Sequence, residues 1–446
     1  MSILDTAFEM LEKHSLCNNC LGRQFALLAR GVENNERGKA LKLGLTMQAS
    51  ALNLDGEKEG LRKLNVLVSN GFSIEAETAL CQSGKRVPKH KVQACFLCDG
   101  KFQIIDVLAQ KVLEEAAYYE YTTFLVGIEL PMTVEEREDE FKAALNVVYG
   151  ESIRHEFGRV LGKLLEEQTG KTVDFRKPDL TIILNPWTEN ITLQVNPLFV
   201  AGRYCKLVRD IPQSKWFCHS CRGKGCEKCG GTGKLYPESV EEIVSKPLLE
   251  DSEGEKSAFH ASGREDVDAR MLGRGRPFVV EISKPKKRRL DLVKAREAIN
   301  TLGGGKVQIS KLRFTNRDVV RKLKKAESAQ KEYRVLIKLD REVTEEELCI
   351  LEAKLTGASI KQQTPLRVLH RRADLTREKY IYKVKVKKVA PNQAEMIIRC
   401  QGGLYVKELV SGDEGRTLPN VAELLGGGAK TLKLDVLNVI LEDLVR

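Results

Sequence analysis

Several features that would assign a location or function directly are missing from this sequence of 446 residues. It has no run of about 18 apolar residues, so we expect no membrane-spanning helix. The opening stretch "MSILDTAFEMLEKH" lacks the basic and apolar regions of a secretory signal. We therefore expect an intracellular, cytoplasmic protein that does not associate with a membrane.

Nucleotide-binding and hydrolase motifs are absent too. "LGGGKV" and "LGGGAKT" fit neither GxxxxGK[ST] nor GxGxxG, and both are typical of turns or helix ends. There is no GxSxG, and the six histidines form no convincing catalytic triad. An ATP-dependent, dinucleotide-dependent or serine-hydrolase activity is therefore disfavoured.

The charge balance is modestly basic. The chain has 73 lysines and arginines against 62 acids, a net charge of +11. This favours a polyanionic partner, although a basic surface kept for solubility explains the charge equally well. The length predicts two to four domains.

Cysteine is plentiful and paired, with eight of the twelve residues in four CxxC motifs. In an intracellular protein such pairs favour a metal over a disulfide. Glycines between the two central pairs allow one four-thiolate site there, the alternative being that these pairs serve a partner at longer range. The two distant pairs predict a second site that staples the N-terminal region, the alternative being two unrelated turns. Four thiolates leave no open coordination position, so both predicted Zn²⁺ sites are structural. The ligands are Cys17, Cys20, Cys95 and Cys98, and Cys218, Cys221, Cys226 and Cys229.

Residue patterns predict an α+β protein. "FGRVLGKLLEEQTG" is an amphipathic helix ending at Gly170, and Thr133 with Glu136 forms a capping box. Alternation in "YKVKVKK" places Tyr382, Val384 and Val386 on the buried face of an antiparallel sheet. Cys349 and Cys400 lie in apolar stretches and are expected in the core. The expected divisions are residues 1–100 (zinc-binding), 101–213 (α+β), 214–254 (cysteine-rich insert and linker) and 255–446 (alternating strands and helices).

One polar stretch stands out as a catalytic candidate. "SGREDVDAR" sets three acids among arginines on a glycine turn before a predicted strand. On general grounds Glu265, Asp266 or Asp268 could be the functional acid. The order Gly263, Arg264, Glu265, Asp266 resembles the Gly-Arg-x-Asp motif of pseudouridine synthases. That resemblance selects Asp266 as the catalytic aspartate and implies that Arg264 faces RNA.

Two later stretches extend the resemblance. "EYRVLIKL" is similar to the strand that carries the active-site tyrosine, which implies that Tyr333 lies against the uridine. "GGLYVKELV" is similar to the third motif, which implies that Lys407 pairs with Asp266 and that Tyr405 forms a second wall of the pocket. A flipped base loses its stacking, and a tyrosine ring can replace part of it.

The sequence also resembles one particular family within the pseudouridine synthase superfamily. "HASGREDVDARMLGRGRPFVVEI", the N-terminal cysteines and the α+β region together resemble the archaeal and eukaryotic tRNA pseudouridine 54/55 synthases. The resemblance covers nearly the whole chain and is strongest from about 255 to 425. It implies a zinc-stapled N-terminal region with a THUMP-like RNA-binding domain, followed by a mixed-sheet catalytic domain. It also implies a tRNA T-arm substrate, an aspartate nucleophile, and no organic cofactor or obligate protein partner.

Basic clusters support RNA binding, although each alone is usually a solvated face. They include "KPKKRRL", "RKLKK" and "RVLHRR", which contains Arg367. The main alternative is a non-catalytic, zinc-containing tRNA-binding protein or chaperone, distinguished only by the set Asp266, Tyr333 and Lys407. A tRNA methyltransferase or thiolation enzyme is disfavoured by the missing glycine-rich loops.

Overall fold

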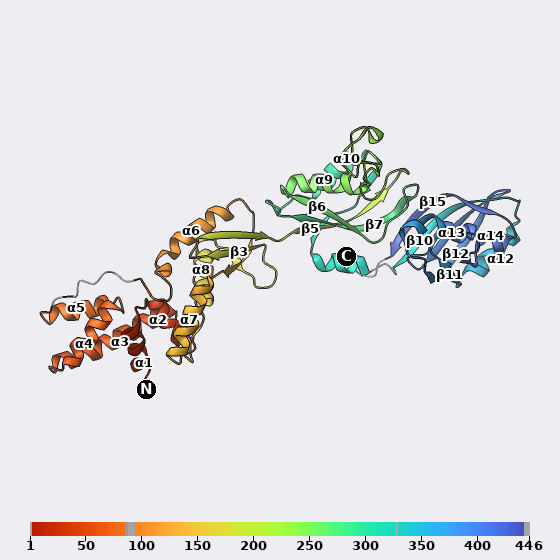
Figure 1. Ribbon diagram of the computed structural model, residues 1–446. Helices are drawn as coiled ribbons and strands as arrows, with labels where there is room; N and C mark the ends of the chain where they lie inside the picture. The colour runs from red at the N-terminus through yellow and green to blue at the C-terminus, as the bar shows by residue number, and fades with distance from the viewer. Residues whose placement is uncertain (1, 86, 88–93, 326–328, 441–446) are drawn as a thin grey trace. The chain divides into compact units, whose positions relative to one another are not determined.

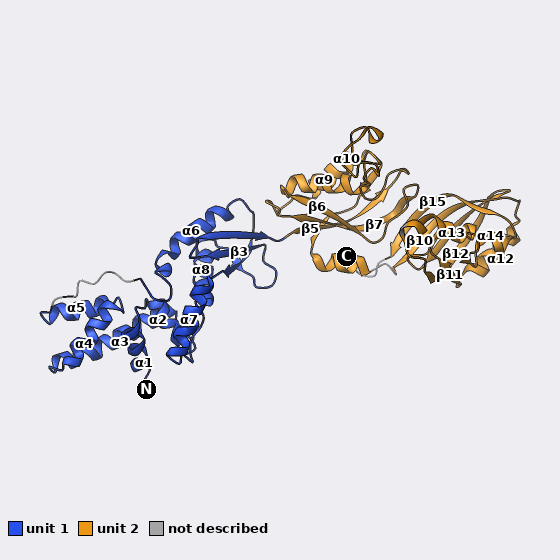
Figure 2. Cartoon of the chain, viewed as in Figure 1, with its two compact units in different colours: residues 1–196 blue, residues 197–446 orange. Residues whose placement is uncertain are grey.

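The computed structural model describes residues 2–85, 87, 94–325 and 329–440. The chain divides into two compact units, Met1–Asn196 (unit 1) and Pro197–Arg446 (unit 2), shown in Figures 1 and 2. Each unit combines helices with a sheet that has both parallel and antiparallel pairs, so the predicted α+β class is confirmed. Among the described residues, no helix is both long enough and apolar enough to cross a membrane.

The first part of unit 1 is helical. Helix α1 begins with a capping box at Ser2 and buries Phe8, Met10 and Leu11. Cys20, Cys95 and Cys98 belong to the same hydrophobic core. The helices are α1 (Ile3–Lys13), α2 (Asn18–Gly22), η1 (Arg23–Phe25), α3 (Asn34–Leu54), α4 (Lys58–Ser69) and α5 (Ile74–Gln82).

The rest of unit 1 places helices against a four-stranded sheet of order β2-β1-β3-β4. Gly170 ends α8 with a φ of 65°, as predicted. The cap predicted at Thr133 is wrong, because α7 starts after Pro131 and Thr133 lies inside the first turn. The elements are η2 (Lys101–Ile104), α6 (Ile105–Ala116), β1 (Thr123–Ile128), α7 (Met132–Ala144), α8 (Ile153–Thr169), β2 (Thr172–Val173), β3 (Leu180–Asn185) and β4 (Asn190–Val195).

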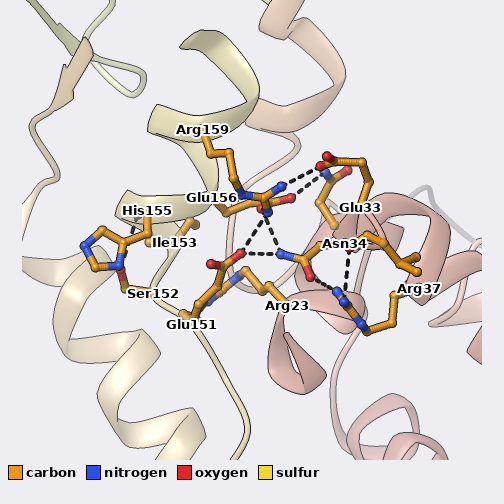
Figure 3. A network of polar contacts seen from close by, with 12 residues as sticks. Arg23, Glu33, Asn34, Arg37, Glu151, Ser152, Ile153, His155, Glu156 and Arg159 are labelled. Atoms are coloured by element: carbon orange, nitrogen blue, oxygen red, sulfur yellow. Dashed lines mark hydrogen bonds and ion pairs between the residues drawn. The ribbon is translucent and has the colours of Figure 1, made fainter. Parts of the chain in front are cut away.

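A buried polar network joins the two parts of unit 1 (Figure 3). Glu156 on α8 is buried and accepts a hydrogen bond of 2.8 Å from Asn34, at the start of α3. Arg159 pairs with Glu156 on the same helix. Arg23, with a fully buried side chain, pairs with Glu138 on α7. Because buried charges need partners, these contacts tie the N-terminal helices to α7 and α8.

Unit 2 is built on a sheet whose described part has eleven strands, ordered β14-β11-β12-β13-β10-β15-β7-β5-β8, with β6 on β7 and β9 on β5. Its elements are β5 (Leu198–Lys206), η3 (Glu227–Cys229), α9 (Val240–Ser252), β6 (Lys256–Ala261), β7 (Arg270–Ser283), α10 (Leu292–Gly303), β8 (Val307–Ile309), β9 (Arg313–Thr315), α11 (Arg317–Lys325), β10 (Gln330–Leu339), α12 (Glu345–Leu355), β11 (Ser359–Gln363), η5 (Leu366–Arg371), β12 (Thr376–Ala390), β13 (Gln393–Cys400), α13 (Val406–Ser411), β14 (Thr417–Leu418), α14 (Val421–Leu425) and β15 (Ala429–Ile440).

The two halves of this sheet meet at a short junction. Strand β15 pairs with β7 in parallel through Asp435↔Arg270 and Val436↔Met271. Strand β5 lies within the range 101–213 predicted for the α+β domain, but it pairs with β7 and belongs to unit 2. The residue pattern of a strand identifies its buried face but not the sheet that it joins.

Two smaller expectations differ from the structure. A register shift between Ile381 and Lys383 interrupts the alternation of β12. Ile381 and Val384 are therefore buried, whereas Tyr382, predicted on the buried face, is exposed. Cys400 is buried as expected, but Cys349 is exposed on α12.

Candidate active site

The "SGREDVDAR" stretch forms the loop between β6 and β7, which we call the catalytic loop (residues 262–269). Gly263 has a φ of 78°, a conformation that favours glycine. Lys206, a buried residue at the end of β5, donates to the backbone oxygens of Asp266 and Val267, both at 3.1 Å. The ammonium group of Lys206 thus fixes the backbone of the catalytic loop to the end of β5.

The first acid of the loop is an anchor. Glu265 is buried and accepts a hydrogen bond of 2.9 Å from Nε of Arg276. Its two carboxylate oxygens also contact the Tyr204 hydroxyl at 3.0 and 2.9 Å. Gln213 donates to that hydroxyl at 2.6 Å. Both oxygens of the Glu265 carboxylate are therefore bound by buried groups of the protein.

Asp266 has a different environment. One of its oxygens, Oδ2, lies 3.3 Å from Nζ of Lys407 and 3.3 Å from a guanidinium nitrogen of Arg367. The side chain retains 37% exposure, so its carboxylate remains accessible. Lys407, on α13, is the partner expected from the resemblance. Arg367, on η5, was expected only as part of a basic RNA-binding cluster.

Lys407 contacts a second acid as well. Its Nζ lies 2.8 Å from an oxygen of Asp268, closer than it lies to Asp266. Burial alone would raise the pKa of Asp268, but the hydrogen bond and charge of Lys407 outweigh it, and the pKa is lowered. Lys407 is therefore shared between two carboxylates.

The predicted site residues line one cleft of about 570 Å³ in unit 2. Tyr333 is half-buried on β10, and burial raises the pKa of its phenol. The Tyr405 hydroxyl accepts a hydrogen bond of 3.2 Å from Arg372. The cleft brings together Arg264, Asp266, Tyr333, Tyr405 and Lys407.

Cations dominate the lining of this cleft. Among the described residues, the acids that contribute to it are Glu265 and Asp266. A concave surface of this sign attracts phosphates, and its tyrosines offer ring faces to a base. The basic lining residues are Arg264, Arg276, Lys325, Lys331, Arg367, Arg372, Arg377, Lys379 and Lys407.

Both predicted cysteine groups converge. The ligand atoms of each tetrad all lie within 4.8 Å of one another. Cys17 and Cys98 sulfurs are 3.7 Å apart, and Cys218 and Cys226 sulfurs are 3.9 Å apart. These spacings are too long for a disulfide but suit a tetrahedron with Zn–S bonds of about 2.3 Å. The residues therefore fit a four-thiolate metal ion.

Arg367 and Arg276 were missed as site residues. Arg367 stands 101 positions after Asp266 in a basic stretch, and Arg276 is one of several arginines around the loop. No local spacing distinguishes either from a solvated cation. Their acidic partners identify them only once the chain is folded.

Known proteins match nearly the whole length of this chain. The family model "Pus10, C-terminal" matches residues 199–440, and "Pus10 THUMP domain, archaeal" matches residues 108–185. A tRNA pseudouridine synthase Pus10 from Methanocaldococcus jannaschii is 44% identical, covering 97% of this chain and 93% of that protein.

Further relatives bear the same name. Those from Methanopyrus kandleri and Methanothrix thermoacetophila are 40% and 38% identical, each over 98% of this chain and covering 98% and 94% of the relatives. Among solved structures, "Crystal Structure of a Cbf5-Nop10-Gar1 Complex" matches at 18% identity, with a TM-score of 0.27, over 44% of each chain.

Proposed function

The chain belongs to the Pus10 family of tRNA pseudouridine synthases, and we propose that it isomerises uridines 54 and 55 in the T-loop of tRNA, with Asp266 as the catalytic carboxylate. It is an isomerase with a THUMP domain in unit 1 and a pseudouridine synthase domain in unit 2. The positions of the modified uridines and the roles of the site residues are the proposed part.

The observation that carries the proposal is the contrast among three neighbouring acids. Glu265 is enclosed and bound to Arg276 and Tyr204. Asp268 does not line the cleft and binds Lys407. Asp266 alone of the three both lines the cleft and keeps an accessible carboxylate beside two cations. An accessible carboxylate that faces a cleft is the group that covalent or electrostatic catalysis on a bound nucleotide needs.

The reaction requires little beyond these groups. The N1–C1′ bond of uridine breaks, the base turns, C5 bonds to C1′, N1 gains a proton and C5 loses one. No electron and no phosphate is transferred, so we propose that no organic cofactor takes part. Asp266 either bonds to the substrate or stabilises a cationic sugar, and Lys407 and Arg367 lie 3.3 Å from its Oδ2.

The tyrosines and Arg264 would receive the nucleotide. A base withdrawn from its stack costs a few kcal/mol, and an aromatic face returns part of that cost. We propose that Tyr333 and Tyr405 supply such faces at the cleft. Arg264 and the other cleft cations would bind phosphates of the T-arm.

We propose structural Zn²⁺ in both cysteine tetrads, because sulfur spacings and four-thiolate chemistry fit that ion. Such an ion has no open position and takes no part in isomerisation. We infer no obligate protein partner, and we propose that the enzyme works on tRNA in the cytoplasm.

The test maps pseudouridines in an unmodified tRNA transcript incubated with the protein alone. We expect pseudouridine at positions 54 and 55 with the native protein, and none with Asp266→Asn, which cannot supply a carboxylate. Asp268→Asn is the matched control and should retain activity within roughly tenfold, since it removes only one of the acceptors of Lys407.

Full pseudouridine formation by a folded Asp266→Asn variant would overturn the catalytic assignment. Modification elsewhere in the transcript, with positions 54 and 55 untouched, would overturn the T-loop assignment and leave the family unchanged.

A further inference from the structure

The second cysteine tetrad lies in a mostly exposed stretch of unit 2 that contributes no residue to the lining of the cleft. We call residues 214–236 the cysteine finger. Its two arms are joined by hydrogen bonds from Leu235 N to Trp216 O (2.9 Å) and from Cys218 N to Gly233 O (2.8 Å). Cys218 is at one of these contacts and the other three cysteines lie between the two arms, so a metal ion there would hold the tip in place of a hydrophobic core.

The base of the cysteine finger is attached to the catalytic loop. The Trp216 ring lies 5.6 Å from the guanidinium carbon of Arg264, an arrangement typical of a cation–π contact. Gln213, just before the finger, donates to the backbone oxygen of Gly263 at 3.0 Å. Arg264 also lines the cleft. The cysteine finger therefore begins at the rim of the active site.

Its outward side chains are basic and aromatic. Phe217 is 54% exposed, and Nζ of Lys215 lies 5.0 Å from the centre of its ring. Glu227 is the one acid in this stretch. Exposed aromatic rings among cations are the usual elements of single-stranded RNA binding. The exposed basic residues are Lys215, Arg222, Lys224 and Lys228, whereas Lys234 is partly buried and pairs with Glu242.

We propose that the cysteine finger is a second tRNA-binding surface, which contacts the substrate beside the nucleotide that enters the cleft. The proposal rests on tRNA as the substrate, but not on which uridine is modified. The attachment through Trp216 and Arg264 makes this surface continuous with the cationic cleft. The part of the tRNA that adjoins the nucleotide bound in the cleft would therefore contact the cysteine finger, which carries a net positive charge.

The test neutralises three exposed cations of the finger with Arg222→Gln, Lys224→Gln and Lys228→Gln. The matched control removes the same charge from exposed lysines of unit 2 outside the finger and cleft, with Lys246→Gln, Lys294→Gln and Lys354→Gln. The Kd for an unmodified tRNA transcript is measured for both at several salt concentrations, together with kcat at saturating tRNA and the zinc content.

We expect the finger variant to raise Kd about 10- to 100-fold and to lower the slope of log Kd against log salt by about 2–3, one counterion for each lost phosphate contact. Its kcat and zinc content should stay within about twofold of the native values. The control variant should raise Kd less than about threefold. Equal Kd values and equal slopes for the two variants would overturn the proposal.

A second pair of variants tests the aromatic part without changing charge. Phe217→Ala should raise Kd by roughly tenfold, and Phe217→Tyr should restore it, because a tyrosine keeps the stacking face. Native Kd in Phe217→Ala would remove the ring from the proposed surface. These variants are judged by Kd, whereas Asp266→Asn is judged by pseudouridine formation. A negative result for the cysteine finger therefore leaves the catalytic assignment unchanged, and a negative result for Asp266 leaves the proposed binding surface unchanged.

Discussion

Glu265 occupies the same loop as Asp266, but its carboxylate is enclosed by Arg276 and Tyr204. Burial alone would lower the pKa of Arg276, yet the charge of Glu265 outweighs it and the pKa is raised. The pair is thus a buried ion pair, in which each charge depends on the other. Glu265 therefore fixes the conformation of the catalytic loop, and the neighbouring Asp266 is the proposed catalytic residue.

This division predicts different losses for the two acids. Glu265→Gln leaves the Arg276 guanidinium buried without a counter-charge, so the free energy of unfolding of unit 2 should fall by about 3 kcal/mol. Asp266→Asn, at a half-exposed position, should change it by less than about 1 kcal/mol. Urea unfolding monitored by fluorescence of Trp216, in a Trp187→Phe background, measures both, because the chain has only these two tryptophans. Equal losses would contradict the assignment.

At the residue scale, the sequence identified the groups that the motifs contain. Asp266, Tyr333, Tyr405 and Lys407 could be predicted because each lies in a stretch with a recognisable order, and all four line the cleft. Arg367 could not, since its position beside Asp266 results from the folding of a distant segment.

Among the elements, the junction of β7 with β15 depends on one carboxylate. Asp435 binds Arg270 at 2.8 Å, Arg209 at 2.7 Å and Arg334 at 3.2 Å. Burial would raise the pKa of Asp435, but the hydrogen bonds from Arg270 and Arg334, with the charge of Arg209, lower it to about 2. Strands β7 and β15 pair through only two residues each, and this cluster of ion pairs reinforces that short pairing.

The stability of unit 2 should therefore depend on acid pH through Asp435. The folded pKa lies below the unfolded value of 3.8, so the contribution is present above about pH 4 and is lost as the pH falls towards 2. Asp435→Asn should lower the free energy of unfolding at pH 7 by about 2 kcal/mol and remove that part of the acid dependence.

The control for this junction is Asp374→Asn, which breaks an exposed pair with Arg416 and should cost less than about 1 kcal/mol. Unfolding curves at pH 7 and between pH 4 and 2 would separate the two variants. If the free energy of unfolding fell equally between pH 4 and 2 in the native protein and in Asp435→Asn, the role of Asp435 would be contradicted.

Helices were easier to predict than the neighbours of strands. The helix expected to end at Gly170 is found as α8 (Ile153–Thr169) with Gly170 after its last residue, because its pattern is local. The register shift in β12 and the pairing of β5 with β7 depend on partners far along the chain. A period of two shows that a strand exists but leaves its place in a sheet open.

At the scale of the whole molecule, the two cysteine tetrads have different surroundings. Cys20, Cys95 and Cys98 belong to the hydrophobic core of unit 1. Cys221, Cys226 and Cys229 are half-buried on the cysteine finger. A metal ion in the first would support the packing of a whole unit, and one in the second would support a projection.

Single substitutions should separate these roles. Cys17→Ser and Cys218→Ser should each remove one of two zinc ions per chain. Loss of the first should lower the melting temperature of unit 1 by about 10 °C, and loss of the second should shift that of unit 2 by less than about 3 °C while weakening tRNA binding. Elemental analysis and calorimetry test this, and unchanged zinc in either variant would remove that site.

The pairing of Arg23 with Glu138 also has a consequence in time. The two residues are 115 positions apart, so a ribosome adding about 5–20 residues per second reaches Glu138 about 6–23 s after Arg23. During that interval Glu138 is not available as the partner of the guanidinium. The N-terminal helices can complete their burial of this cation only after most of unit 1 has been synthesised.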